Sequence, residues 1–169
     1  MTSSADVRAI VLTDDGTFPN NYRVALTLYP GAFGSSPDPG EIETYLKKCG
    51  WQPAWRYGIY PYHHFHSTAH EFLACYSGSA RVIFGGDKGQ ALELATGDAV
   101  LVPAGVAHKC LSSSNFAVVG AYPKGQAPDM NYGRPGERPK ADLAIEALGL
   151  PPTDPVTGLK WPDFHAVIS

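Results

Sequence analysis

The sequence predicts an all-β domain in which short strands close into a barrel or sandwich. Between residues 22 and 122, runs rich in β-branched and aromatic residues alternate with glycine, proline, aspartate and serine turns, a spacing typical of this class. Eight of the 15 prolines fall in residues 123–169, where a missing backbone donor disfavours a sheet. We therefore expect one domain over residues 1–169, with a barrel core at about 20–122 and a proline-rich wrapping tail at about 123–169.

The first elements follow from residue type along the chain. Residues 22–29 (YRVALTLY) are rich in side chains that favour a strand. A helix is expected over residues 41–49. Asp38 can cap its start, Pro39 suits its first turn, and Gly50 suits its end.

The remaining strands are separated by turn-forming residues such as Ser77-Gly78 and the run from Ser112 to Asn115. A second helix is expected over residues 140–148, with Leu143 on its apolar face. The strands are predicted at residues 57–66, 71–77, 80–85, 90–94, 98–103, 108–112 and 115–122.

Composition excludes two classes of partner and indicates a compartment. The chain carries 13 Lys and Arg against 16 Asp and Glu, a net charge of −3, with no basic stripe, so neither nucleic acid nor a membrane surface is expected to bind it. No cationic start followed by an apolar run precedes the domain, so no secretory signal is predicted. Three cysteines at unrelated spacings fit reduced thiols, and we expect a cytoplasmic protein.

Four histidines crowd into eight residues beside one glutamate: His63, His64, His66 and His70, followed by Glu71. On a strand, residues i and i+2 point to the same face, so the second and third of these histidines would project together and share one ion. A turn after them would bring the glutamate back to that face. A single histidine on a strand is more often a packed or surface residue than a metal ligand, and we interpret His63 in this way. Spacing alone therefore leaves open whether the other histidines bind a metal ion or only pack.

Two groups of residues resemble the two motifs of the cupin superfamily. The first is Gly58, five residues, His64-Phe65-His66, four residues, Glu71, six residues and Gly78. The second is Gly97, five residues, Pro103, one residue, Gly105, two residues and His108, followed by Ser112 where the family usually has Asn. Further stretches, among them Phe18-Pro19-Asn20-Asn21 and Asp154-Pro155-Val156-Thr157-Gly158, resemble the YjlB-like group of small cupins. The likeness runs from about residue 10 to about residue 160.

The resemblance implies a double-stranded β-helix, the jelly-roll barrel of cupins, with one or two short helices. It also implies one divalent transition metal ion inside the barrel, held by His64, His66, Glu71 and His108. Three imidazoles and one carboxylate suit Fe, Mn, Ni, Co, Cu or Zn without selecting one of them, and they leave coordination positions open. His70 would replace one of these ligands or support them from behind.

The alternation of side chains along a strand predicts which residues surround the ion. Tyr60 and Tyr62 share the alternation of the histidine pair, and Cys110 shares that of the last histidine, so all three are candidates to contact a substrate. Tyr62 is also a catalytic candidate, because a phenol can donate to a bound oxygen, and Glu71 is another, as a general base. Arg56 is a candidate carboxylate anchor. The alternatives are a solvated arginine and, for the cysteine, an apolar filler.

Three functions stay open. The first is an enzyme in which the metal is a Lewis acid or binds O₂, such as a dioxygenase or a sugar or keto-acid isomerase. The second is a non-catalytic barrel that captures a small metabolite, and the third is a scaffold with an incidental metal. The complete ligand set disfavours the third, and open coordination positions favour the first over the second. A homodimer is also expected, because edge strands need covering; residues 22–29 or the tail could exchange between subunits.

Overall fold

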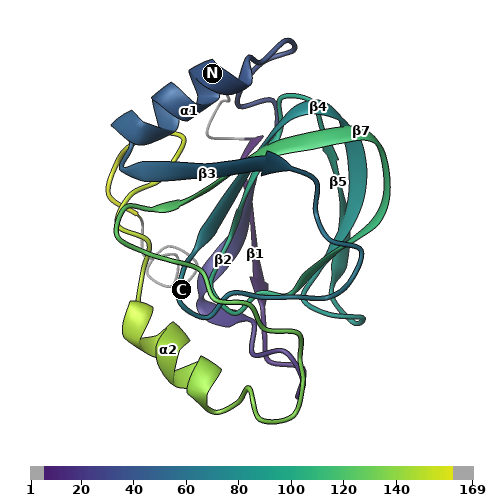
Figure 1. Cartoon of the computed structure of the whole chain (residues 1–169), viewed down its shortest axis with the longest axis vertical. Coiled ribbons are helices and arrows are strands. Elements are labelled where there is room, and N and C mark those ends of the chain that lie inside the picture. The colour runs from purple at the N-terminus through teal and green to yellow at the C-terminus, as the bar shows by residue number, and fades with distance from the viewer. Residues whose placement is uncertain (1–5, 162–169) are drawn as a thin grey trace.

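The computed structural model describes residues 6–161 and is built mainly from antiparallel strands, with two short helices (Figure 1). This agrees with the predicted all-β class. The terminal part of the expected tail, residues 162–169, lies outside the described residues. The elements in chain order are β1 (Arg8–Leu12), β2 (Asn21–Tyr29), α1 (Pro39–Lys48), β3 (Trp51–Tyr57), β4 (Glu71–Phe84), β5 (Gln90–Ala95), β6 (Ala99–Val102), β7 (His108–Pro123) and α2 (Lys140–Leu148).

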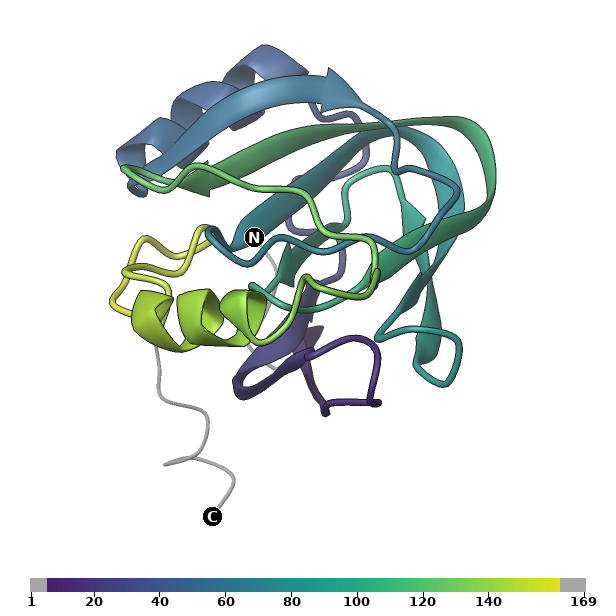
Figure 2. The same cartoon turned by 60° about the horizontal axis from the view of Figure 1, so that its bottom comes forward.

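The long strand β4 organises the sheet. The strand order is β1-β2-β6-β4-β7-β3, with β5 also paired to β4, and every pairing is antiparallel. The first half of β4 lies between β6 and β7, and its second half lies between β5 and β7. Because the partner on one side changes along β4, the strands wrap around an interior, as Figure 2 shows.

Two predicted turns are instead bulges inside long strands. Gly78 has φ +65°, and the β4–β7 register shifts on both sides of Ser77. A Cβ at Gly78 would lie 2.1 Å from the Ser114 carbonyl oxygen, so the two backbones touch where a side chain would be. Asn115 on β7 also has a positive φ, 49°. Glycine here marks a close approach of two strands, and each pair of predicted strands is one continuous strand.

The strand predicted at 57–66 is wrong in position. The strand in this region is β3, and residues 58–63 form a loop. His64 joins the sheet only through an isolated bridge to His108. Pro53 is tolerated within β3 because this strand is at the end of the sheet and its register shifts between Pro53 and Trp55.

Alternation along β4 divides the apolar side chains between two cores. The outer core lies between α1 and the sheet and contains Phe72 of β4. The inner core lies inside the barrel and contains Leu73. Glu71 is two residues from Leu73 on the same strand, so both side chains point to the interior of the barrel. Asp38 caps α1 as predicted, accepting from the Glu41 N–H at 3.0 Å.

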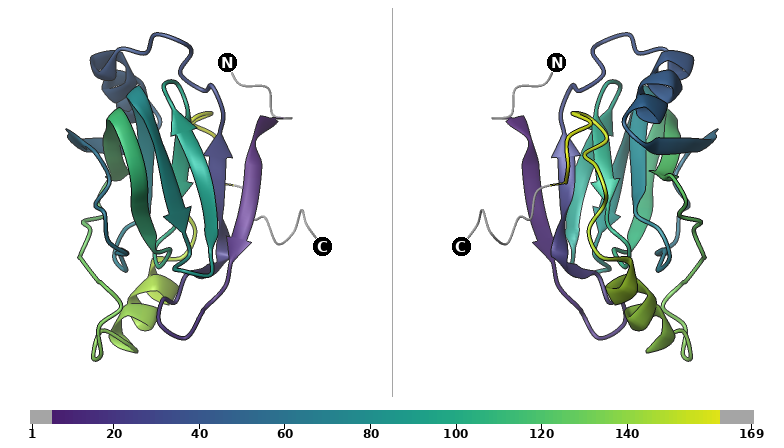
Figure 3. Two further views of the ribbon diagram at one scale, coloured as in Figure 1. Left: turned by 90° about the vertical axis from the view of Figure 1, so that its right-hand side faces the viewer. Right: turned by 90° about the vertical axis from the view of Figure 1, so that its left-hand side faces the viewer.

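The residues after β7 return across the molecule and carry α2, and Figure 3 shows this helix at one end of the sheet. Its range, 140–148, agrees with the prediction, but its buried face does not. Leu143 is 65% exposed, and Ala141 is the buried residue of the helix. Of the helices in the described chain, none is both long and apolar enough to cross a bilayer.

β2 lies next to the end of the sheet. It pairs with β1 on one side and, over Thr27–Tyr29, with β6 on the other. The expected homodimer, with exchange of residues 22–29 or of the tail, stays a prediction.

Candidate metal centre

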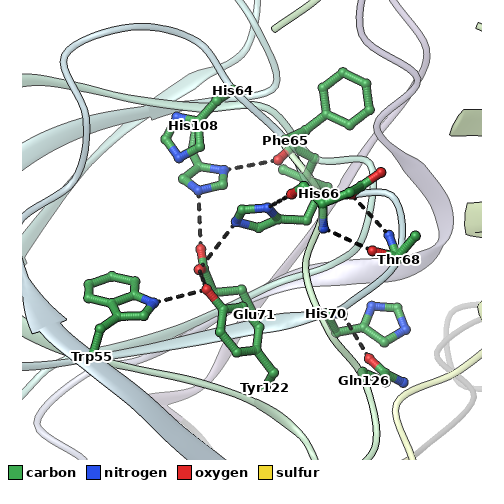
Figure 4. Close-up of polar contacts among 12 residues, drawn as sticks. Trp55, His64, Phe65, His66, Thr68, His70, Glu71, His108, Tyr122 and Gln126 are labelled. Carbon is green, nitrogen blue, oxygen red and sulfur yellow. Dashed lines mark hydrogen bonds and ion pairs between the residues drawn. The ribbon is translucent and has the colours of Figure 1, made fainter. Parts of the chain in front are cut away.

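Three histidines converge inside the barrel. His64 and His66 follow the 58–63 loop, and His108 begins β7. Their candidate ligand nitrogens all lie within 4.8 Å of one another, and all three residues are buried (Figure 4). The backbones of His64 and His108 exchange two hydrogen bonds, at 3.2 and 3.0 Å. This bridge holds residues far apart in the sequence at a fixed spacing.

In each of the three histidines, the ring nitrogen that points away from the centre of the cluster lies beside a backbone group. In each case Nδ1 lies within hydrogen-bonding distance of a carbonyl oxygen, and a carbonyl can only accept. Each Nδ1 therefore carries the proton, and each Nε2 of a neutral ring presents a lone pair to the interior. The acceptors are the carbonyls of Tyr62 at 3.0 Å, Asp129 at 2.6 Å and Val106 at 3.1 Å, for His64, His66 and His108 respectively.

Glu71 completes the cluster at the start of β4 and is 3% exposed. Its two oxygens lie 3.3 Å from the Nε2 of His66 and 3.2 Å from the Nε2 of His108. A lone pair facing a carboxylate at this distance is repulsive unless a proton or a cation lies between them. The donor set therefore fits a divalent cation, which would take lone pairs from three imidazoles and charge from one carboxylate.

The carboxylate is also held from its other side. The Tyr122 hydroxyl donates to Oε2 of Glu71 at 2.9 Å, and Nε1–H of Trp55 donates to the Tyr122 oxygen at 2.9 Å (Figure 4). Gly120 allows this arrangement, because a Cβ there would lie 2.2 Å from the Trp55 ring. A chain of donors from β3 through β7 thus orients the glutamate.

The electrostatics follow from burial and from these neighbours. Burial alone would raise the pKa of Glu71, but His66 and His108 hold that pKa well below its usual range. Burial opposes protonation of His66, yet the Glu71 carboxylate beside it raises its pKa. Burial and the neighbouring His108 lower the pKa of His64 to about 3. Without metal, the Glu71 carboxylate therefore lies beside His66, which binds a proton readily, while His64 remains neutral.

A cavity of about 410 Å³ opens onto this centre. The cluster lies at its polar end, where Tyr122 also contributes to the wall. The rest of the wall is largely apolar or aromatic. Besides the cluster, Tyr122 and Asp129, it is formed by Trp55, Tyr57, Gly58, Ile59, Tyr60, Leu73, Pro128 and Met130.

The two predicted tyrosines lie on different sides of this wall. Tyr60 lines the cavity and packs edge-on against His64, with ring centroids 5.3 Å apart. Tyr62 stacks on Tyr60 with ring centroids 5.0 Å apart, packs edge-on against His64 at 5.9 Å, and lines a separate surface hollow with Tyr132. Its ring is not among the residues that line the cavity, and its backbone carbonyl accepts from the Nδ1 of His64. A catalytic role for Tyr62 stays a prediction.

Arg56 and Cys110 lie away from the cavity wall. Arg56 forms an ion pair with Glu43 of α1, and its side chain is 47% exposed. As β3 lies under α1, the arginine points to the helix and not to the interior. Cys110 packs at the margin of the inner core and directs its Sγ to the Ser112 carbonyl at 3.5 Å. Neither residue lines this cavity, so contact with a substrate stays a prediction that the wall of the cavity does not support.

His70 also takes a different role from the one expected. Its Nδ1 accepts from the Ala104 N–H at 2.9 Å, so its Nε2–H donates to the Gly149 carbonyl at 2.9 Å. Both nitrogens are occupied, and in Figure 4 the ring points away from Glu71. His70 ties β4 to the β6–β7 turn and to the end of α2, and it neither replaces nor supports a metal ligand.

Three residues of the site are absent from the sequence prediction: Tyr122, Trp55 and Asp129. Tyr122 has the same alternation as His108, but the prediction divided this strand at residues 112–115 and did not carry the alternation through to Tyr122. Asp129 contacts the centre through a backbone carbonyl, for which sequence carries no signal.

This chain belongs to the cupin superfamily. The family model described as a Cupin domain matches residues 57–119, which span both halves of the metal centre. The uncharacterized protein YjlB of Bacillus subtilis (strain 168) is 44% identical over 150 residues, which cover 88% of this chain and 89% of that protein. The resemblance to YjlB-like cupins predicted from the sequence is therefore confirmed.

Among solved structures, the DMSP lyase DddQ of Ruegeria pomeroyi DSS-3 is 17% identical with a TM-score of 0.38, covering 77% of this chain and 52% of that one. The 11S allergen of Cocos nucifera L. is 23% identical with a TM-score of 0.37, covering 54% of this chain and 30% of that one. This chain therefore spans only part of the length of either solved protein.

Proposed function

We propose that this chain binds one divalent transition metal ion through His64, His66, Glu71 and His108 and uses it on a small molecule in the adjacent cavity. The observation that carries the proposal is the contact of each of the three imidazoles with a backbone carbonyl through Nδ1. Each Nδ1–H donates to a carbonyl, so the three Nε2 lone pairs converge beside the Glu71 carboxylate. Fe, Mn, Ni, Co, Cu and Zn all suit such a mixed nitrogen and oxygen set.

The proposed activity is that of a small-molecule metalloenzyme of the dioxygenase or isomerase type. A metal ion in such a site supplies Lewis acidity to an oxygen atom of its ligand. The chain's own groups for moving a proton are Glu71 and Tyr122. Burial and the nearby carboxylate raise the pKa of Tyr122, so its hydroxyl keeps its proton and donates a hydrogen bond to Glu71.

A non-catalytic metabolite-binding barrel is the second candidate. It is favoured by the wall of the cavity, which offers few polar groups beyond the metal ligands and Tyr122. Turnover separates the two candidates. An enzyme converts a bound molecule, whereas a carrier releases it unchanged.

The first experiment measures bound metal in protein purified without a metal-binding tag. We expect about one equivalent in the wild type and none in His64→Ala or His108→Ala. His63→Ala is the matched control, since His63 is the neighbouring histidine but pairs with Asp87 at 2.7 Å outside the centre. Circular dichroism checks that each variant is folded. No metal in the wild type, after loading with Fe, Mn, Ni and Zn, would contradict the proposal.

We further propose that the protein is a homodimer. β1 ends the sheet and is largely exposed, so it offers an edge to a second copy. Sedimentation at micromolar concentration tests this, and a mass equal to one chain would contradict it.

A further inference from the structure

The walls of the cavity restrict what can bind at the metal centre. We infer that its ligand is a small molecule with an uncharged, mainly apolar body and with its oxygen atoms gathered at one end. This inference deepens the proposed metal function and rests on it. It excludes polyhydroxylated sugars and ligands with a charged group on the body of the molecule.

The first argument is the distribution of polar groups along the cavity. We call Trp55, Ile59, Leu73, Pro128 and Met130 the apolar wall. Leu73 lies deep, at 1% exposed, whereas Met130 lies near the mouth, at 36% exposed. A molecule that reaches the imidazoles therefore passes along apolar side chains for the depth of the cavity. Away from the centre, the described side chains that line the cavity offer only the phenols of Tyr57 and Tyr60 and the Asp129 carboxylate as polar groups. Several hydroxyl groups spread over the body of a ligand would therefore lose water without all gaining partners.

The second argument is charge. Among the described residues that line the cavity, none is lysine or arginine, and the two carboxylates are Glu71 and Asp129. Arg56, the nearest candidate for an anion anchor, is paired with Glu43 on the outer side. A charged group on the ligand body would thus meet no cation away from the metal. A divalent ion would be balanced by the two carboxylates.

The third argument concerns Asp129, the carboxylate nearest the wall. Its Oδ1 accepts from the Ser67 N–H at 2.6 Å and from the Thr68 N–H at 3.3 Å, and its Oδ2 accepts from Asn131 at 3.0 Å and from the Ser67 hydroxyl. These four donors occupy both carboxylate oxygens, so Asp129 has little capacity left for ligand hydroxyls.

The coordination positions that the protein leaves open determine which chemical group the bound molecule presents to the metal; we call this oxygen-bearing end the head. Four protein ligands leave one or two positions on a five- or six-coordinate ion. Two neighbouring oxygens on one end of a molecule fill two such positions. Tyr122 can accept a hydrogen bond from that head, since its single proton is directed to Glu71.

The test compares two ligands that share a chelating head and differ in the body. Zinc-loaded protein is titrated by calorimetry with 4-methylcatechol and with 3,4-dihydroxybenzoate, and each affinity is corrected for its affinity for free zinc. Zinc has no redox chemistry, so the catechols are not oxidised by the metal. We expect 4-methylcatechol to bind at least ten-fold more tightly. A smaller ratio, or a preference for the acid, overturns the inference.

A matched pair of variants locates the effect. Met130→Arg places a cation at the mouth of the cavity and should shift the ratio at least five-fold toward the acid. Leu143→Arg adds the same charge on the exposed face of α2, outside the cavity wall, and should leave the ratio unchanged. Equal shifts in both variants would overturn the inference. Failure to bind zinc overturns the proposed function and this inference together, whereas zinc binding without the ten-fold preference overturns this inference alone.

Discussion

Each imidazole of the candidate metal centre is oriented by a single backbone carbonyl on its far side. This arrangement fixes the tautomer and the ring plane before any ion arrives. Glu71 is oriented in the same way, but by a side chain, the Tyr122 hydroxyl. Residues behind the ligands therefore decide how well the ligands are placed.

Tyr122→Phe should weaken metal binding by about ten-fold, because Glu71 loses the donor that orients it. The dissociation constant, measured by competition with a chelator, checks this. Tyr57→Phe removes a hydroxyl from the same cavity at an exposed position and should leave the constant unchanged. Equal effects in both variants would show that the hydrogen bond to Glu71 is unimportant.

His70 should make the metal-free protein sensitive to acid. Burial lowers its pKa to about 4, while an unfolded histidine titrates at about 6.5. Between these values the unfolded chain binds a proton that the folded chain refuses, so stability is full above about pH 6.5 and falls toward pH 4.

Urea unfolding of metal-free protein at pH 7.5 and pH 5.0 measures this effect. The His70 contribution to the free energy of unfolding should fall by about 2 kcal/mol between the two values. His70→Gln can keep an amide hydrogen bond without titrating, so its pH dependence should be smaller by that amount. An identical dependence in both proteins would rule out His70 as the source.

At the scale of elements, the bulge between β4 and β7 lets both strands continue past residues that resemble turns. β4 carries Glu71 at one end and pairs with β5 at the other, so the bulge couples the metal centre to the far part of the sheet. Gly78 makes this possible, since its backbone lies against the Ser114 carbonyl.

Gly78→Ala should therefore destabilise the fold by about 3 kcal/mol, because it combines a positive φ with a backbone clash. Gly125→Ala is the control: Gly125 also has a positive φ, 89°, but a Cβ there meets nothing within 4 Å. We expect the control to cost about 1 kcal/mol. Chemical denaturation measures both, and equal losses would show that φ alone accounts for the effect.

At the scale of the whole molecule, the four ligands come from three separate parts of the chain. A bound ion would join the segment after the 58–63 loop to the starts of β4 and β7. An ion that binds only the folded state stabilises it by about 4 kcal/mol at a thousand times its dissociation constant.

For a chain of this size that stabilisation corresponds to a rise in Tm of about 10 °C. Differential scanning calorimetry with nickel or zinc tests it, and EDTA should reverse the rise. His64→Ala should show no rise, whereas His63→Ala should respond like the wild type. A metal-induced rise of the same size in His64→Ala would indicate binding elsewhere.

The amino-acid sequence alone determined the all-β class and the cap of α1, because turn residues and capping chemistry are local, and its motif spacing nominated the candidate ligands. The ligands His64, His66, Glu71 and His108 were chosen through the cupin resemblance, and the structure brings them together. Local pattern failed where a loop interrupts alternation, as at residues 58–63. Only the tertiary structure decided that Tyr122 orients the glutamate, that Arg56 turns to α1, and that His70 binds backbone. Those contacts join residues distant in sequence, and packing of the two cores places them.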